Sequence, residues 1–262
     1  MDSFSLTSFI YLAIACFSAA FIDAIAGGGG MISLPAFMGV GIPPHIALGT
    51  NKMAASFGAF SSFLKFLKSG KVEVELIKKV FIFTVIGAIV GVKSVLLIDS
   101  KYLYPMALTL IILLIGYTLY HKNMGFVNDF QGVNKDSLLK GTIMAFTLGF
   151  YDGFFGPGAG SFLIFGFIKI FKFDFIHASG NAKALNFASN IVSVILFAYF
   201  GKINYYYALP MAGFMFLGAQ AGAHFAIKKG SKFIKPVFLI VSTAVALKMA
   251  NQFIDFKQFL GM

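Results

Sequence analysis

Two stretches of the sequence place a carboxylate, several glycines and a lysine within apolar surroundings. The first begins at Asp23, continues through Gly27, Gly28, Gly29 and Gly30, and ends at Thr50, Asn51 and Lys52. The second begins at Asp152, continues through Gly156, Gly158 and Gly160, and ends at Asn181 and Lys183. The aspartates are 129 residues apart (152 − 23) and the lysines 131 (183 − 52), so the second stretch repeats the first.

Glycine runs of this kind interrupt helices and leave backbone N–H and C=O groups without helical partners. Within a membrane, such backbone is stable only where protein or a polar cavity satisfies it, and matched interruptions in two halves indicate a substrate site. A helix N-terminus beside an ammonium and an amide attracts a small anion. The predicted substrate-binding residues are therefore Gly28, Gly29, Gly30, Thr50, Asn51, Lys52, Gly156, Gly158, Gly160, Asn181 and Lys183.

A packing role for the glycines is the simpler alternative, because small residues also let membrane helices approach closely. Packing does not account for the asparagine and lysine that follow each glycine run. A lysine inside a membrane segment is costly and indicates a function, although extension of its side chain to the membrane surface is the competing explanation.

The two aspartates allow three roles, which are pairing with a lysine, capping the following short helix, or carrying a coupled proton. The N-cap preference of aspartate favours capping or pairing over proton transfer for Asp23 and Asp152. His45 and His177 lie just before the two lysine-containing stretches. A histidine at a helix entry more often has a capping or interfacial role, and proton coupling through these residues stays open.

The composition is that of an integral membrane protein. Of 262 residues, 58% are hydrophobic and only 12% are charged, which is more apolar surface than a soluble domain of this size buries. Ten apolar segments follow one another, at about 4–25, 27–42, 45–67, 79–98, 103–121, 138–155, 157–172, 176–200, 204–227 and 233–252. Eight are long enough to span a bilayer as helices, whereas the glycine-bearing segments at 27–42 and 157–172 are short and could cross or re-enter.

The lysines predict how these segments are oriented. All basic residues are Lys, and they lie mostly in short loops, as in cytoplasmic loops of membrane proteins and unlike a nucleic-acid site. If all ten segments cross with the N-terminus outside, the outer side carries only Lys101, Lys202 and Lys257. Five segments per half then make the halves an inverted repeat. We expect an all-α polytopic membrane protein with a first repeat at 1–122, a cytoplasmic linker at 123–137 and a second repeat at 138–262.

Other classes of function lack support in the sequence. The single Cys16 excludes an internal disulfide and a cysteine-built metal site. No metal-ligand cluster, catalytic triad or paired-acid motif is present, so we expect neither an enzyme nor a bound metal or cofactor. A Walker A pattern is also absent, which leaves ion gradients or the membrane potential as energy sources. The sequence does not indicate an oligomeric state.

Four stretches resemble the sulfite exporter TauE/SafE family, also called the TSUP family. They are GGGGMISLPAFMGVGIPPHIALGTNKMAASFG and FLKFLKSGKV in the first half, and GFYDGFFGPGAGSFL and ASGNAKALNFASN in the second. The resemblance implies a bacterial inner-membrane carrier for sulfite, organosulfonates or related small anions that does not hydrolyse ATP. The family's motif positions fall on Gly27 to Gly30, Asn51, Lys52, Gly156, Gly158, Asn181 and Lys183.

We therefore expect a secondary transporter that exports such an anion by alternating access, with the anion and the lipid bilayer as its partners. A passive anion channel and an importer of an organosulfur anion are the alternatives. The residues do not distinguish among anions, and proton coupling stays open.

Overall fold

The computed structural model describes residues 6–99, 102, 109 and 127–230. In this part the chain forms helices joined by turns: α1 (Leu6–Ala26), α2 (Gly30–Gly39), α3 (Pro44–Lys68), α4 (Val74–Leu96), α6 (Lys135–Phe154), α7 (Ala159–Phe171), α8 (Phe175–Tyr199) and α9 (Tyr205–Lys229). Each predicted segment that falls in the described part overlaps one of these helices. The predicted segments at 103–121 and 233–252 lie outside the described residues.

The helices confirm the prediction of an all-α polytopic membrane protein. By length and composition, α1, α4 and α8 could each cross a membrane, and α2 and α7 are shorter apolar helices. Two helices begin several residues earlier than predicted: α4 begins at Val74, before the expected start at 79, and α6 begins at Lys135, within the expected linker. The early start of α6 has a local reason. The cause is a capping box in which Asn134 and Ser137 bind each other's backbone N–H groups and start the helix there.

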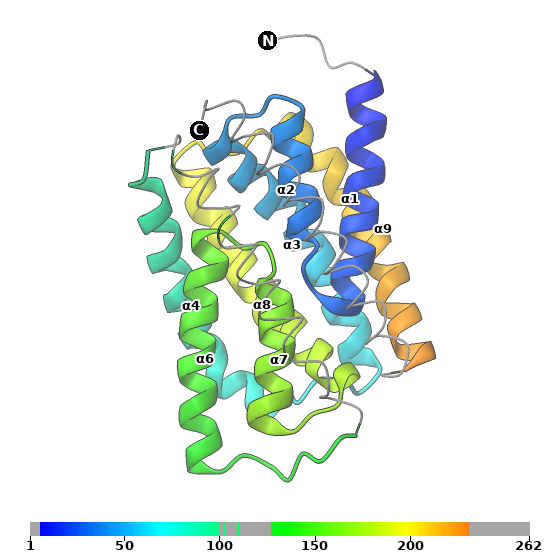
Figure 1. The fold of residues 1–262 in the computed structure, drawn as a ribbon, viewed down its shortest axis with the longest axis vertical. Helices are drawn as coiled ribbons and strands as arrows, with labels where there is room; N and C mark the ends of the chain where they lie inside the picture. The colour runs from blue at the N-terminus through cyan, green and yellow to red at the C-terminus, as the bar shows by residue number, and fades with distance from the viewer. Residues whose placement is uncertain (1–5, 100–101, 103–108, 110–126, 231–262) are drawn as a thin grey trace.

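The two halves of the chain begin at opposite ends of the bundle (Figure 1). α1 starts at the top of the view and α6 at the bottom. α4 packs against α6 on one side and α9 packs against α1 on the other, so the fourth helix of each half contacts the first helix of the other half. α2, α3, α7 and α8 lie between these pairs.

Glycines allow the same close contact on both sides. A Cβ atom at Gly87 or Gly91 of α4 would overlap backbone carbonyl oxygens of α6, and one at Gly218 or Gly222 of α9 would overlap those of α1. The two glycine pairs are 131 residues apart (218 − 87 and 222 − 91). These equivalent contacts support the predicted repeat.

Each glycine-bearing segment forms a hairpin with the helix before it. α2 runs back along α1, and α7 runs back along α6 (Figure 1). α2 has 10 residues and α7 has 13, so at 1.5 Å per residue they are about 15 and 20 Å long, shorter than the roughly 30 Å hydrocarbon core. Because α2 runs back along α1 and α7 along α6, each short helix ends at the end of the bundle where the helix before it began. The loops therefore lie on the sides that the ten-segment prediction gives them.

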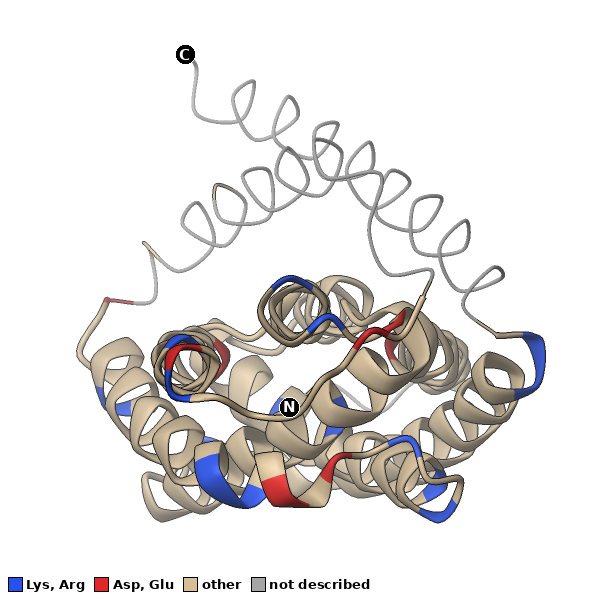
Figure 2. Cartoon of the chain, turned by 90° about the horizontal axis from the view of Figure 1, so that it is seen from below, with Lys and Arg blue, Asp and Glu red and all other residues tan. Residues whose placement is uncertain are grey.

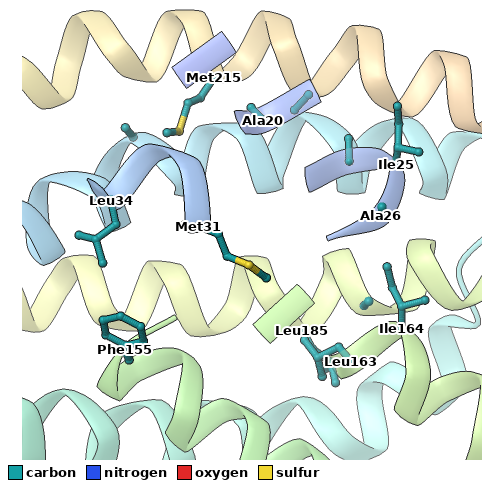
Figure 3. Close-up of a cluster of buried hydrophobic side chains, with 14 of the residues drawn as sticks. Ala20, Ile25, Ala26, Met31, Leu34, Phe155, Leu163, Ile164, Leu185 and Met215 are labelled. Atoms are coloured by element: carbon teal, nitrogen blue, oxygen red, sulfur yellow. The ribbon is translucent and has the colours of Figure 1, made fainter. Parts of the chain in front are cut away.

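The turns of the two hairpins lie inside the bundle. Gly27 and Gly28 in the first turn, and Gly156 and Gly158 in the second, adopt positive φ angles that favour glycine. Buried apolar side chains surround them, among them Met31 and Leu34 of α2 and Leu163 of α7 (Figure 3). This packing fixes the interrupted backbone in the middle of the protein.

Lysines gather at the lower end of the bundle, which Figure 2 shows face on. They lie at the end of α3, the start of α4, the start of α6, the end of α7 and the end of α9, and comprise Lys65, Lys68, Lys78, Lys79, Lys135, Lys140, Lys169, Lys228 and Lys229. At the other end, the described residues carry Lys93 in the last turn of α4 and Lys202 between α8 and α9. The positive-inside rule, as applied to the sequence, predicts that the lower end is the cytoplasmic one.

Candidate functional site

The two hairpin turns contact each other at the centre of the bundle. A Cβ atom at Gly27 would overlap the backbone of Ser161, and one at Gly30 would lie 3.1 Å from the Cα atom of Pro157. The hydroxyl of Ser161 donates a hydrogen bond to the carbonyl oxygen of Ala26 at 3.1 Å. The N-termini of α2 and α7 therefore meet from opposite directions, one from each repeat.

A small cavity lies beside this contact. Its walls include glycines of both turns, polar side chains of α3 and α8, and both aspartates: Asp23, Gly28, Gly29, Gly30, Ser33, Asn51, Lys52, Asp152, Gly156, Gly158, Gly160, Asn186 and Asn190. The space open to the centres of water molecules is about 40 Å³. At roughly 10–15 Å³ per water by this measure, the cavity has room for a few water molecules or one small ion.

Lys52 and Asp152 form a buried ion pair across the two repeats. The Lys52 ammonium lies 2.6 Å from Asp152 Oδ1, and the side chains are only 4% and 3% exposed. Lys52 also donates to Asn190 Oδ1 at 3.0 Å. Asp152 Oδ2 accepts hydrogen bonds from Asn186 Nδ2 at 3.0 Å and from the hydroxyl of Ser189. The Lys52 ammonium thus has two hydrogen-bond partners and the Asp152 carboxylate has three.

Lys183 and Asp23 form the second ion pair, with the roles of the repeats exchanged. Lys183 is fully buried, whereas the Asp23 side chain is 24% exposed. Apart from Lys183, the carboxylate of Asp23 accepts one hydrogen bond, from the backbone N–H of Gly29 at 3.0 Å. Asp23 thus both pairs with a lysine and binds the backbone at the start of α2.

Asn51 is the one buried polar group of the cavity wall with an unsatisfied atom. Its side chain makes no hydrogen bond within the described residues, and its Oδ1 atom is buried without a partner. The residue is only 6% exposed and lines the cavity. A buried amide without partners costs stability, so its position is typical of a group that binds a ligand or ordered water.

Three residues predicted to bind substrate do not line the cavity. The hydroxyl of Thr50 accepts the backbone N–H of Asn204, and Oδ1 of Asn181 accepts the backbone N–H of Glu73, each at 2.9 Å. These bonds hold the residues at the starts of α9 and α4. Lys183 lies behind the wall, against Asp23.

The two predicted histidines also lie away from the cavity. Nε2 of His45 lies 3.1 Å from the carbonyl oxygen of Val95. Nδ1 of His177 lies 2.8 Å from Asp174, whose carboxylate caps the start of α8. Burial raises the pKa of Asp174, but hydrogen bonds from the side chain and backbone of His177 outweigh burial and leave the pKa below its ordinary value.

Sequence reasoning did not assign Asn186, Ser189 and Asn190 to the site. They follow Lys183 on α8 at helical spacings of three, six and seven residues. Because a helix repeats every 3.6 residues, this spacing places polar groups on the face that carries the lysine. That periodicity is the signal that could have identified them. In the described part of the chain, no group of three or more His, Cys, Asp or Glu side chains could hold a metal ion.

Known proteins similar to this chain are membrane transporters. The family model described as sulfite exporter TauE/SafE matches residues 12–249. The probable membrane transporter protein ORF9 of a Sinorhizobium species is 38% identical over 253 residues, 94% of this chain and 93% of that protein. A probable membrane transporter protein of Haemophilus influenzae is 38% identical over 234 residues, 89% of this chain and 91% of that protein.

A third relative, the probable membrane transporter protein YfcA of Escherichia coli K12, is 35% identical over 231 residues, 88% of this chain and 85% of that protein. No solved structure is significantly similar to the chain. The matches extend over both glycine-bearing turns and the lysines that follow them.

Proposed function

The chain belongs to the sulfite exporter TauE/SafE family of membrane transporters, and we propose that it is a secondary carrier for sulfite, an organosulfonate or a related small sulfur-containing anion. The anion binds in the cavity between the two hairpin turns. Export across the bacterial inner membrane is the proposed direction, because a negative interior drives an uncoupled anion outward.

The side chain of Asn51 is the observation that carries this proposal: its Nδ2 group makes no hydrogen bond within the described residues and can donate to an anion, while its buried Oδ1, an acceptor, also has no partner there. It stands in the wall of a cavity that also contains the N-terminal backbone of α2 and α7 and the ammonium of Lys52. Helix N-termini, an amide and an ammonium all donate hydrogen bonds, and a compact oxyanion can accept several at once. The small volume favours an anion the size of sulfite or a short sulfonate over a large organic molecule.

The arrangement of the two turns supports alternating access. Each turn belongs to one repeat, and the two meet at a cavity near the middle of the bundle. A movement of one repeat against the other would open the cavity first to one side and then to the other. The proposed binding residues are Gly28, Gly29, Gly30, Asn51, Lys52, Gly156, Gly158 and Gly160.

Asn51→Ala tests the site directly. Loss of a hydrogen bond to a charged group costs about 1.5–3 kcal/mol, so we expect the affinity for the transported anion to fall by roughly 10- to 100-fold. The measurement is ligand-induced thermal stabilisation of the purified protein with sulfite, thiosulfate, sulfate and methanesulfonate, since an anion that binds the folded state raises the unfolding temperature.

Thr50→Val is the matched control, because Thr50 is the neighbouring residue of α3 and its hydroxyl contacts α9 and not the cavity. We expect it to lower stability without a comparable loss of anion affinity. Absence of stabilisation of the wild-type protein by all four anions would contradict the proposed substrate class. An affinity unchanged in Asn51→Ala would contradict the proposed site.

Counterflow in proteoliposomes distinguishes a carrier from a passive channel. A carrier exchanges labelled anion faster when unlabelled anion is present on the other side of the membrane. A channel shows no such stimulation, and that result would favour the channel.

A further inference from the structure

We infer that Asp23 carries a proton that binds together with the anion. The inference rests on the proposed function as an anion carrier and adds a second transported species. It assigns different roles to the two aspartates, which occupy equivalent positions in the repeats.

The first step is the charge balance of the cavity. Two ammonium groups, Lys52 and Lys183, pair with two carboxylates, Asp152 and Asp23. Together these four side chains carry no net charge when all are ionised. A monovalent anion that entered would leave one uncompensated negative charge in a buried site, which is strongly unfavourable. Uptake of one proton by a carboxylate restores neutrality.

The second step is the choice between the two carboxylates. Asp152 accepts hydrogen bonds from Lys52, Asn186 and Ser189 and is 3% exposed. Hydrogen bonds of this kind stabilise the ionised form and hold the side chain in place. Asp23 has only Lys183 and the Gly29 N–H as partners, and 24% of its side chain is open. Asp23 is therefore the carboxylate that a proton can reach and neutralise at lower cost.

The third step is what protonation releases. Lys183 donates to Asp23 alone within the described residues. Once Asp23 is neutral, the buried ammonium of Lys183 needs another negative partner. A Cβ atom at Gly160 in the cavity wall would lie 3.6 Å from Lys183 Nζ, so an anion beside Gly160 comes close to this ammonium. The anion then replaces the carboxylate as the partner of Lys183.

The charged groups around Asp23 are few. In the described part of the chain, the titratable side chains of the cavity and its ion pairs are Asp23, Lys52, Asp152 and Lys183. Among the helices packed against α1, His45 of α3 and His177 of α8 bind other groups, and His224 of α9 is exposed. Among the described histidines, none therefore replaces Asp23 as the proton site.

Transport of one proton with each monovalent anion is electrically neutral. The membrane potential then no longer drives export, and the sum of the anion and proton gradients sets the direction. An acidic exterior opposes export, so export then requires an outward anion gradient that exceeds the inward proton gradient.

The test measures anion affinity of the full-length purified protein at several pH values, with methanesulfonate as a monovalent anion that does not titrate near neutral pH. In the wild type we expect affinity to fall by up to about tenfold per unit as the pH rises, because one proton is linked to binding. Addition of anion to weakly buffered protein should also remove protons from solution, as a pH-indicator dye reports. In Asp23→Asn, both the pH dependence and the proton uptake should disappear while binding remains.

Asp174→Asn is the control, since it removes a carboxylate that does not line the cavity, and it should keep the wild-type pH dependence. Binding by the wild type without proton uptake would overturn the inference and leave the proposed function intact. The inference is also overturned if anion affinity of Asp23→Asn still depends on pH, or if the pH dependence is lost only in Asp152→Asn. Absence of any anion binding by the wild type contradicts the proposed function itself. If Asp23→Asn does not fold, proton uptake by the wild type on addition of anion decides whether a proton binds together with the anion.

Discussion

At the scale of single residues, the two ion pairs connect the repeats. Lys52 of the first half binds Asp152 of the second, and Lys183 of the second half binds Asp23 of the first. Each lysine follows its own glycine-bearing turn in sequence but neutralises the aspartate before the other turn. Both ion pairs therefore join the two halves beside the cavity, and any relative movement of the halves must change them.

Removal of one partner of the Lys52–Asp152 pair should destabilise the protein strongly. Breaking a buried pair leaves an uncompensated charge and typically costs about 3–5 kcal/mol. We expect Lys52→Met to lower the apparent unfolding temperature of purified protein markedly, and the double variant Lys52→Met with Asp152→Asn to recover part of the loss.

Lys140→Met is the control for this experiment. Lys140 pairs with Asp136 at 2.6 Å, but the side chains are 59% and 73% exposed, and exposed pairs contribute about 0–1 kcal/mol. A small effect of Lys52→Met, equal to that of Lys140→Met, would show that the buried pair does not stabilise the fold.

The sequence predicted the chemistry of the site better than its geometry. The glycines, Asp23, Asp152, Asn51 and Lys52 line one cavity, as their spacing suggested. Asn181 does not, and the reason is its register: it lies 130 residues after Asn51 (181 − 51), whereas the lysines are 131 apart. A shift of one residue turns a side chain by about 100° around a helix. Thr50 is the true equivalent of Asn181, and both contact the start of another helix.

At the scale of helices, glycines determine how closely the halves approach. Gly87 and Gly91 on α4, and Gly218 and Gly222 on α9, lie one helical turn apart on the faces that contact α6 and α1. Small residues at this spacing let two backbones pack with many van der Waals contacts, which stabilises helix pairs inside a membrane. Close helix packing, the alternative role considered for the glycines of the two turns, is thus the role of these other glycines.

Gly91→Ala should weaken the contact between α4 and α6. The new Cβ atom would overlap the carbonyl oxygen of Phe150, which belongs to a helix backbone and cannot move aside freely. Overpacking of this kind costs about 1–3 kcal/mol. The measurement is the apparent unfolding temperature in detergent, which should fall.

Gly213→Ala on α9 is the matched control, because a Cβ atom there would meet nothing within 4 Å in the described structure. Alanine is the better helix former by about 1 kcal/mol, so this variant should be as stable as the wild type or more so. Equal stability of the two variants would contradict a role for Gly91 in close packing.

The positions of the helices could be predicted from hydropathy, but the path of the two short ones could not. Segment length left crossing and re-entry open for α2 and α7. The return of each helix along its predecessor depends on the turns at Gly27 and Gly156, which pack closely against distant residues, Ser161 and Lys52 respectively. Such long-range contacts have no periodic signal in the sequence.

At the scale of the whole molecule, the opposed repeats give the protein one basic end. The ends of α3 and α9 and the starts of α4 and α6 place their lysines there, although they come from both halves (Figure 2). The halves have opposite orientations, so equivalent loops lie at opposite ends, and lysines are concentrated in only one loop of each equivalent pair. The uneven distribution of lysines therefore predicts one orientation in the membrane, while the two glycine-bearing turns at the centre remain equivalent.

This orientation can be tested with two single cysteines at equivalent positions. Ser69 and Phe200 are the C-cap residues of α3 and α8, 131 residues apart (200 − 69), and both are exposed. With the basic end in the cytoplasm, a maleimide that does not cross membranes should label Phe200→Cys in intact spheroplasts and should label Ser69→Cys only after the membrane is opened. The native Cys16 is buried in α1 and provides the unlabelled background. Labelling of Ser69→Cys in intact spheroplasts would reverse the orientation, and equal labelling of both positions would show that the two loops do not lie on opposite sides of the membrane.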